Sequence, residues 1–411
     1  MKTGRILCVT STFPRWSGDS TAPFVLHLAQ DLQALGWQVD VLAPHAPGAA
    51  TTEVLDGVSV ERFRYLWPAS QQTVCYQGGA LVNLRRRPSE GLKLPALVAA
   101  ELLALARRLA TRRYDILHSH WLLPQGVVGQ LSHTIGRVPH VTTVHGGDLF
   151  GLNSPLMRAF KRFVLQRADA VTVNSSFTEQ GVRALVPAPR QLRRIPMGVV
   201  TAALSAGQRE QSAVLRARYR RDPGPLLIFV ARLVEEKGAG DLIDATAELR
   251  AAYPAITTVI LGDGPERSAL ERRVKALHLD NCVHFPGWVA PADLGSWLAA
   301  ADIFVGPSRT AANGQVEAQG LTFLEAQVAG LPVIGTRLGG IPDAVIHEQT
   351  GLLVDERAPH QIATAVRRLL KEPWLAQRLA EQGKAHALMH FSRAASARAF
   401  SALFDDVRSV R

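Results

Sequence analysis

The chain has 411 residues, 47% of them hydrophobic and 20% charged, a composition that excludes a disordered protein and suits two globular domains. Its three cysteines, Cys8, Cys75 and Cys282, lie far apart without CxxC or metal-ligand spacing, which excludes a disulfide framework. The first apolar run, Ile6–Val9, is too short for a signal peptide, and no apolar run reaches the roughly 18 residues of a membrane span. The sequence therefore predicts a cytoplasmic protein.

The net charge of +11 is concentrated in the first half. Residues 1–200 contain 22 Lys and Arg against 12 Asp and Glu, so they carry +10, and residues 201–411 carry +1. This asymmetry indicates either an anionic partner or an arginine-rich solvated face with no partner. The basic clusters are Arg85–Arg87, Arg107-Arg108, Arg112-Arg113 and Arg158 with Lys161 and Arg162. No DNA-binding module or aromatic-interleaved basic motif accompanies them, which favours an anionic membrane surface over nucleic acid.

Short apolar runs alternate with segments of helical periodicity throughout the chain, which predicts repeated βαβ units and parallel sheets. In the first half we expect strands at Ile6–Ser11, Gln38–Ala43, Asp115–His118, His140–Val144 and Ala170–Asn174, and helices at Pro23–Leu35 and Leu92–Arg113. The Asp56-Gly57 turn and the alternation that follows it predict a hairpin over residues 53–66, inserted in the first domain.

The second half repeats the pattern. We expect strands at Leu226–Ala231, Thr257–Leu261, Val283–Phe285, Ile303–Gly306 and Pro332–Gly335, and helices at Ala239–Arg250, Arg267–Leu277 and Ala358–Leu370. The prediction is an N-terminal domain over residues 1–200, a C-terminal domain over 201–390, and a helix over 391–411 that packs back on the N-terminal domain. Because doubly wound sheets bind ligands at the carboxyl ends of their strands, we expect a ligand cleft between the domains.

The most specific pattern contains two glutamates, Glu317 and Glu325, separated by seven residues and followed by a small-residue turn and a strand. Gly320 and Leu321 open a helix, so their N–H groups face a phosphate or sugar oxygen. The Glu325 carboxylate lies about one turn further on and can accept hydrogen bonds from a ribose diol. Without the surrounding pattern, two glutamates at this spacing would be a solvated helix face.

This segment, together with Val230–Gly238 and Gly339–Asp343, resembles the retaining glycosyltransferases of family 4, and the resemblance covers nearly the whole chain. It implies the GT-B fold, an α/β architecture with two Rossmann-like, doubly wound parallel-sheet domains facing across a cleft. It also implies that the second domain mainly binds the nucleotide-sugar donor and the first the acceptor. Glu317 would contact the transferred sugar and Glu325 the ribose.

Two cations follow the strand Leu226–Ala231 at its carboxyl end. A guanidinium at Arg232 and an ammonium at Lys237 can clamp a diphosphate and stabilise the charge that grows as the glycosidic bond breaks. The resemblance gives both residues that role. Outside this pattern they would be surface charges.

In the first half, a loop over residues 12–20 follows the first strand. In the family a glycine-bearing loop at this place lies beside the donor phosphate and the acceptor. Gly18 is the matching residue, and Asp19 is either an acceptor contact or part of a structural turn.

Several histidines follow strands of the first half. The resemblance places His145 against the donor sugar, and Asp148 in the same loop is a candidate for the acceptor side. His118 and His120 either line the acceptor side or are hydrogen-bonded core histidines.

The motifs that the sequence lacks disfavour several classes of enzyme. The sequence contains no Asp-x-Asp and no metal-ligand spacing, so we expect no metal and no cofactor besides the donor substrate. It lacks GxGxxG and GxSxG, which disfavours a Rossmann dehydrogenase and a serine hydrolase. Ala318, Gln319 and Asp343 depart from the family pattern and leave the donor sugar open. The segment Arg309–Val316 resembles a subset that assembles surface polysaccharide.

The sequence thus predicts a metal-independent, retaining glycosyltransferase that uses a UDP- or GDP-linked sugar and is cytoplasmic or peripheral at the inner face of the membrane. The expected acceptor is a lipid-linked saccharide in cell-surface polysaccharide biosynthesis. Transfer to a soluble small molecule is one alternative, and a non-enzymatic nucleotide-sugar sensor on the same fold is another.

Overall fold

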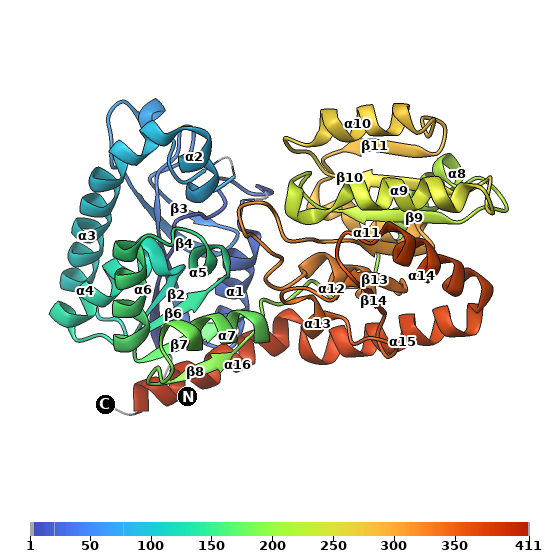
Figure 1. Cartoon of the computed structure of the whole chain (residues 1–411). Coiled ribbons are helices and arrows are strands. Elements are labelled where there is room, and N and C mark those ends of the chain that lie inside the picture. Colours follow the sequence, from blue (N-terminus) through green and yellow to red (C-terminus); the bar gives the residue numbers. More distant parts are fainter. Residues whose placement is uncertain (1–3, 20, 77, 410–411) are drawn as a thin grey trace. The chain divides into compact units, whose positions relative to one another are not determined.

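The computed structural model describes residues 4–19, 21–76 and 78–409, and it consists of two compact units (Figure 1). The first unit runs to Gly198 and takes up the chain again from Arg393, and the second comprises Val199–Ser392. The sequence places these boundaries after residues 200 and 390.

The first unit contains, among its described residues, a sheet in the order β3-β4-β2-β1-β5-β6-β7-β8. Its strands are β1 (Arg5–Val9), β2 (Gln38–Pro44), β3 (Thr52–Leu55), β4 (Val58–Phe63), β5 (Ile116–His120), β6 (His140–Val144), β7 (Ala170–Val173) and β8 (Leu192–Arg194). All neighbours are parallel except β3 and β4. The strand order changes direction between β1 and β5, which is the position where such sheets bind ligands.

The predicted hairpin is present, but it is not an insertion. Its turn residues Asp56 and Gly57 have φ values of 46° and 89°, as a tight hairpin turn requires. The second strand, β4, pairs in parallel with β2 along its length, so the hairpin extends the main sheet. Its alternating pattern reflects one buried and one partly exposed face.

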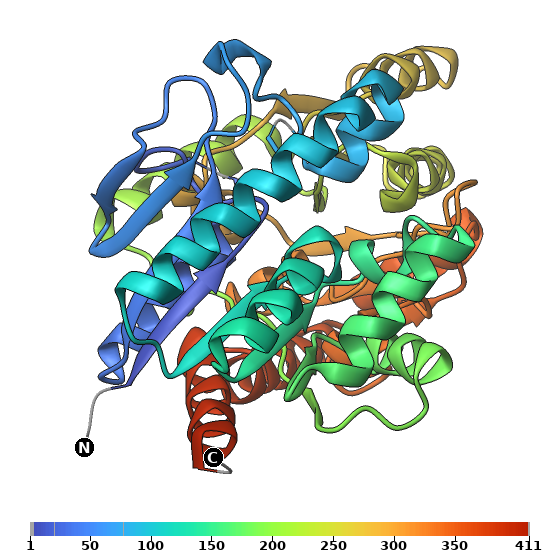
Figure 2. The same cartoon turned by 90° about the vertical axis from the view of Figure 1, so that its left-hand side faces the viewer.

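Helices cover both faces of this sheet. They are α1 (Pro23–Ala34), α2 (Ala80–Arg86), α3 (Leu94–Thr111), α4 (Val127–Gly136), α5 (Gly147–Phe150), α6 (Pro155–Arg167), α7 (Ser176–Leu185) and α16 (Arg393–Ser409), with short turns at η1 (Ala69–Gln71), η2 (Pro88–Lys93) and η3 (Leu122–Gly126). Figure 2 shows α3, α4 and α6 side by side over one face. The last helix, α16, packs on α1, where Arg393 forms an ion pair with Asp31 at 2.7 Å.

The second unit contains a fully parallel sheet in the order β11-β10-β9-β12-β13-β14. Its strands are β9 (Leu226–Val230), β10 (Thr257–Leu261), β11 (Val283–Gly287), β12 (Ile303–Gly306), β13 (Val333–Thr336) and β14 (Leu352–Val354). Its helices are α8 (Ala206–Tyr219), η4 (Glu235–Lys237), α9 (Ala239–Arg250), α10 (Arg267–Ala276), α11 (Pro291–Ala300), α12 (Leu321–Val328), α13 (Ile341–Ala344), α14 (Pro359–Lys371) and α15 (Pro373–His390). The change of direction lies between β9 and β12.

The prediction of two parallel-sheet α/β domains is confirmed. Both sheets are buried on both faces. In the second unit, alternate strand residues form separate clusters with the helices on either side, and in the first unit the adjacent residues Ile6 and Leu7 of β1, which point to opposite faces, are both fully buried. Among the described helices none is long and apolar enough to cross a membrane.

Candidate functional site

Two loops meet at the switch point of the second unit. One follows β9 and carries Arg232 and Lys237, and the other follows β12 and carries Glu317. Gly238, at φ 69°, lets them approach, because a Cβ at this position would collide with the carbonyl oxygen of Pro307. The sheet topology therefore brings together residues that are about 80 positions apart.

Lys237 and Glu317 form an ion pair across these loops. The Oε1 atom of Glu317 also accepts the N–H groups of Gln319 at 3.3 Å and Gly320 at 3.1 Å. Burial by itself would raise the pKa of Glu317, but the charge and hydrogen bond of Lys237, with the two amides, lower it to about 2. Glu317 is therefore ionised at neutral pH and held in one orientation.

The backbone of Glu317 is fixed as well. Its carbonyl oxygen accepts the N–H of Gly340 at 2.9 Å, and a Cβ on Gly339 would collide with the same oxygen. Residues 339–340, which belong to the segment that resembles family 4, thus hold the backbone of Glu317 in place.

Gly320 caps α12 with φ 81°, a left-handed conformation that glycine adopts without strain. Its N–H is bonded to Glu317 and does not face outward, which differs from the prediction for this residue. Within the described chain, the amides of Leu321 and Thr322 have no hydrogen-bond acceptor. They are the donors that this helix end can offer to an anion.

Glu325 lies one turn further along α12 and is half-buried. Burial raises the pKa of its carboxyl to about 7, and none of the described residues forms a hydrogen bond or ion pair with it. Arg232 is exposed, and no acidic group of the described residues pairs with its guanidinium. Both side chains are therefore available to a ligand.

In the first unit, His120 ends β5 and His145 follows β6. Their rings share a hydrogen bond of 3.0 Å between Nδ1 of His120 and Nε2 of His145. Trp121 and Phe24 pack against His145, with ring centroids at 4.9 and 5.2 Å. Desolvation lowers the pKa of His145 to about 3 and that of His120 well below its usual range, so both are neutral at pH 7.

The other first-unit candidates are already engaged by protein groups. Asp148 accepts the N–H groups of Leu122 at 2.8 Å and His145 at 3.1 Å, so it holds the two loops together. His118 is 1% exposed, bonds Thr143 at 2.7 Å and packs on Phe400 and Phe404 of α16. These contacts match the core alternative for His118.

Asp19 has a local role too. Its carboxylate pairs with Arg15 at 2.7 Å and accepts the hydroxyl of Thr21 at 3.0 Å. These partners match the structural-turn alternative. Gly18, at φ 80°, supplies the left-handed residue that this turn requires.

Sequence reasoning missed the contacts that hold the segment 309–316. Glu356 accepts the N–H of Thr310 at 2.5 Å, and Glu235 accepts the N–H of Ala312 at 3.0 Å. It also missed Trp121 and Phe24, although the Trp121 that directly follows His120 was a readable signal. No cluster of His, Cys, Asp or Glu in the part of the chain that the structure describes could hold a metal ion.

Two family models match the chain. The model described as Glycosyltransferase Family 4 matches residues 22–203, and the model described as Glycosyl transferases group 1 matches residues 213–386.

Similar proteins cover most of the chain. The D-inositol 3-phosphate glycosyltransferase of Corynebacterium jeikeium is 32% identical over 384 residues, 85% of this chain and 88% of that protein. The GDP-mannose-dependent alpha-(1-6)-phosphatidylinositol monomannoside mannosyltransferase of Mycolicibacterium smegmatis is 32% identical over 64% of this chain and 69% of that protein. For the protein of the same description from Mycobacterium tuberculosis, the match spans 64% of its length.

Solved structures show the same fold. Sucrose-phosphate synthase of Thermosynechococcus elongatus has a TM-score of 0.78 at 24% identity, covering 99% of this chain and 100% of that chain. HepE of Anabaena in complex with UDP has a TM-score of 0.73 at 20% identity, covering 98% and 100%. Together with the family models, these findings show that the chain belongs to glycosyltransferase family 4, has the GT-B fold and is an enzyme of the hexosyltransferase type.

Proposed function

We propose that this protein is a retaining glycosyltransferase that moves a sugar from a UDP- or GDP-linked donor to the hydroxyl of a lipid-linked saccharide. The observation that carries the proposal is the group of residues on the loops and helix at the β9–β12 switch point. It comprises the fixed Lys237–Glu317 pair, the exposed Arg232, which has no acidic partner among the described residues, and the half-buried Glu325. The similar mannosyltransferase is GDP-mannose-dependent and HepE binds UDP, so both bases occur among relatives and structural neighbours.

The donor diphosphate binds at the carboxyl end of β9. Arg232 offers a guanidinium fork, Lys237 an ammonium, and the start of α12 two amides without acceptors. These positive groups stabilise the diphosphate as it departs, without a bound metal ion. Glu325 accepts hydrogen bonds from the ribose hydroxyls, and Glu317 accepts them from the sugar.

In the first unit, His145 contacts the transferred sugar. Its Nε2 is bonded to His120, which leaves Nδ1 for the ligand. Because its pKa is low, His145 acts as a neutral hydrogen-bonding group. Of the two described carboxylates at this site, Glu317 is bonded to Lys237 and Glu325 is assigned to the ribose, so neither acts as a nucleophile in this proposal. Transfer then proceeds on one face of the sugar and retains its configuration.

The test is turnover with a panel of UDP- and GDP-sugars and candidate acceptors, followed by nucleotide release and by NMR of the product's anomeric proton. We expect release that requires an acceptor, and a product with the anomeric configuration of the donor. Glu317→Gln and Lys237→Met should abolish release, whereas Glu381→Gln, an exposed control on α15, should not. Donor binding without release under any condition would favour the sensor, and an inverted anomer would refute retention.

The lipid-linked acceptor requires that the first unit works at a membrane surface. The apolar residues of α3 that recur near helical spacing face the core: Leu97 and Leu105 belong to the core cluster, and Leu94, Val98, Leu102 and Leu109 pack against it. Leu92 and Leu103, by contrast, are 85% and 73% exposed, close in sequence to the exposed Arg85–Arg87 and Arg107. Basic groups near an anionic leaflet contribute about 1 kcal/mol each, so this face can hold the enzyme at a membrane.

Two residues of the basic clusters do not contribute to the proposed membrane-binding surface. Arg108 is buried and forms an ion pair with Glu61 at 2.6 Å, and Lys161 is fully buried and donates to the carbonyl of Leu149 at 2.7 Å. Both side chains have partners inside the protein, so the sequence clusters that contain them overstate the exposed charge.

Sedimentation with anionic and neutral liposomes tests the membrane proposal. We expect binding to anionic liposomes that weakens as salt rises and is lost when Arg85–Arg87 are changed to Ser. Arg218→Ser, an exposed arginine of the second unit, is the matched control. Equal binding to both liposome types, or binding to neither, would reject the membrane surface and favour a soluble acceptor.

A further inference from the structure

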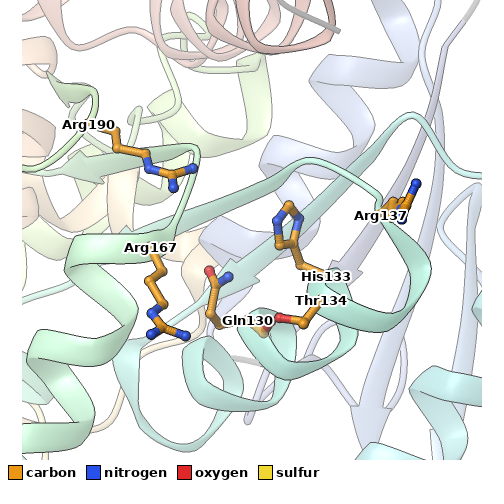
Figure 3. Close-up of a pocket in the computed structure, with 6 residues that line it drawn as sticks. All are labelled: Gln130, His133, Thr134, Arg137, Arg167 and Arg190. Atoms are coloured by element: carbon orange, nitrogen blue, oxygen red, sulfur yellow. Dashed lines mark hydrogen bonds between the residues drawn. The ribbon is translucent and has the colours of Figure 1, made fainter.

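A basic cavity lies in the first unit. It has a volume of about 430 Å³ and is lined by Gln130, His133, Thr134, Arg137, Arg167 and Arg190 (Figure 3). Gln130, His133 and Thr134 belong to α4, Arg137 directly follows it, Arg167 ends α6, and Arg190 lies in the loop before β8.

The cavity lies at the amino-terminal edge of the sheet. β6, β7 and β8 are parallel and begin a few residues after these segments, at His140, Ala170 and Leu192. His145 follows the opposite end of β6, and five strand residues span about 15 Å. A ligand in this cavity therefore does not compete with one at His145.

Positive charge predominates around the cavity. Three guanidinium groups line it, and Asp169 lies 3.6 Å from Arg190 and 3.5 Å from His133. Asp169 also accepts the N–H of His140 at 2.9 Å, which ties it to the backbone. Arg167 stacks on Phe163 at 4.9 Å and has no acidic partner among the described residues.

The wall of the cavity also contains an amide donor that no described protein group accepts. Gln130 is 3% exposed, and its Oε1 is bonded to Nδ1 of His140 at 3.1 Å. Its Nε2 atom has no hydrogen-bond acceptor in the described part of the chain, and Figure 3 shows the amide among the side chains that line the cavity. This amide can therefore donate a hydrogen bond to an acceptor in the cavity.

We propose that this cavity binds the phosphate group of a small phosphorylated ligand. A phosphate presents only hydrogen-bond acceptors and matches guanidinium forks such as those of Arg167 and Arg190, with the Gln130 amide as a further donor. The cavity volume is in the range of small-molecule sites. The alternative is that these arginines only complement the carboxyl ends of α4 and α6.

The experiment measures binding of glycerol 3-phosphate to the full chain by titration calorimetry at constant ionic strength. A second arm uses neutral vesicles that carry phosphatidic acid, whose headgroup is the same phosphate monoester on a lipid. The variants are Arg167→Ala with Arg190→Ala, and Arg162→Ala as the control, because Arg162 is exposed on the same helix but does not line the cavity. Thermal melts show whether the variants are folded. If the double variant is unstable, Arg167→Glu replaces it, because this single change leaves the Arg190–Asp169 ion pair intact.

We expect saturable binding of glycerol 3-phosphate that weakens at least tenfold in the double variant and in Arg167→Glu but not in Arg162→Ala. Binding of the soluble ester alone identifies a soluble ligand. Binding to vesicles that is competed by glycerol 3-phosphate and weakened by the same variants identifies a lipid headgroup. No saturable binding in either arm, or equal affinity in the wild type and the variants, would overturn the proposal.

Discussion

Replacing Lys237 by Met removes the charge that holds Glu317 and keeps most of the apolar side-chain stem. Lowering the pKa of Glu317 from 4.5 to about 2 corresponds to about 3 kcal/mol in favour of its ionised form. The two side chains are 22% and 16% exposed, so water screens part of this interaction. We therefore expect Lys237→Met to lower the free energy of unfolding by about 1 to 3 kcal/mol at pH 7.

The effect should depend on pH in a defined direction. Because folding lowers the pKa of Glu317, the stabilisation is present above the ordinary value of 4.5 and is lost as pH falls towards 2. The difference between wild type and Lys237→Met should therefore be constant near neutrality and should shrink below about pH 4.5.

Differential scanning calorimetry of the full chain measures the effect, with Lys237→Met, Glu317→Gln and the double variant forming a cycle. In a domain of this size, 1 to 3 kcal/mol corresponds to a decrease in Tm of roughly 3 to 10 °C. The control is Arg337→Met, which breaks an ion pair with Asp355 whose side chains are 46% and 63% exposed. A Tm change no larger than that of the control, or no coupling in the cycle, would refute the reasoning.

Three further predictions concern turnover. Glu325→Ala and Arg232→Ala should each lower kcat/KM at least about 100-fold, because each removes a charge-assisted contact with the donor; activity within threefold of wild type would remove that residue from the site. The KM for the donor should rise as pH is lowered from 8 to 6, because a carboxyl with its pKa near 7 then binds a proton, and Glu325→Gln should show no such rise. Turnover should survive EDTA, and loss with rescue by Mg²⁺ or Mn²⁺ would contradict donor binding by protein cations alone.

The sequence predicted the strands because fully buried parallel strands are continuous apolar runs, as in Leu226–Val230. It missed β8 and β14, which have three residues each and give no measurable period. The predicted helix bounds also differ from those in the structure. The predicted start at Leu92 lies in the η2 turn, and α3 begins at Leu94, just before Pro95.

The residues that we propose for the donor could be named from a local sequence pattern, but their geometry could not be predicted from it. The Lys237–Glu317 pair joins loops after different strands, and only the sheet order brings them together. Likewise, whether a carboxylate faces a ligand depends on its neighbours. Aspartates such as Asp19 and Asp148 suit a binding role, but the Asp19 carboxylate is paired with Arg15, and the Asp148 carboxylate accepts the N–H of Leu122.

The protonation states of the named groups limit where the acceptor's proton can go in the proposed reaction. His145, with a pKa of about 3, is too weak a base to remove the proton of a hydroxyl at pH 7, and its Nε2 is already bonded to His120. Glu317, with a pKa of about 2, is weaker still, and its carboxylate is bonded to Lys237 and two amides. Glu325 is basic enough but is assigned to the ribose. The departing phosphate gains negative charge and basicity as the glycosidic bond breaks, so in the mechanism we propose it accepts the proton of the acceptor hydroxyl, while Arg232 and Lys237 stabilise the charge on the leaving diphosphate.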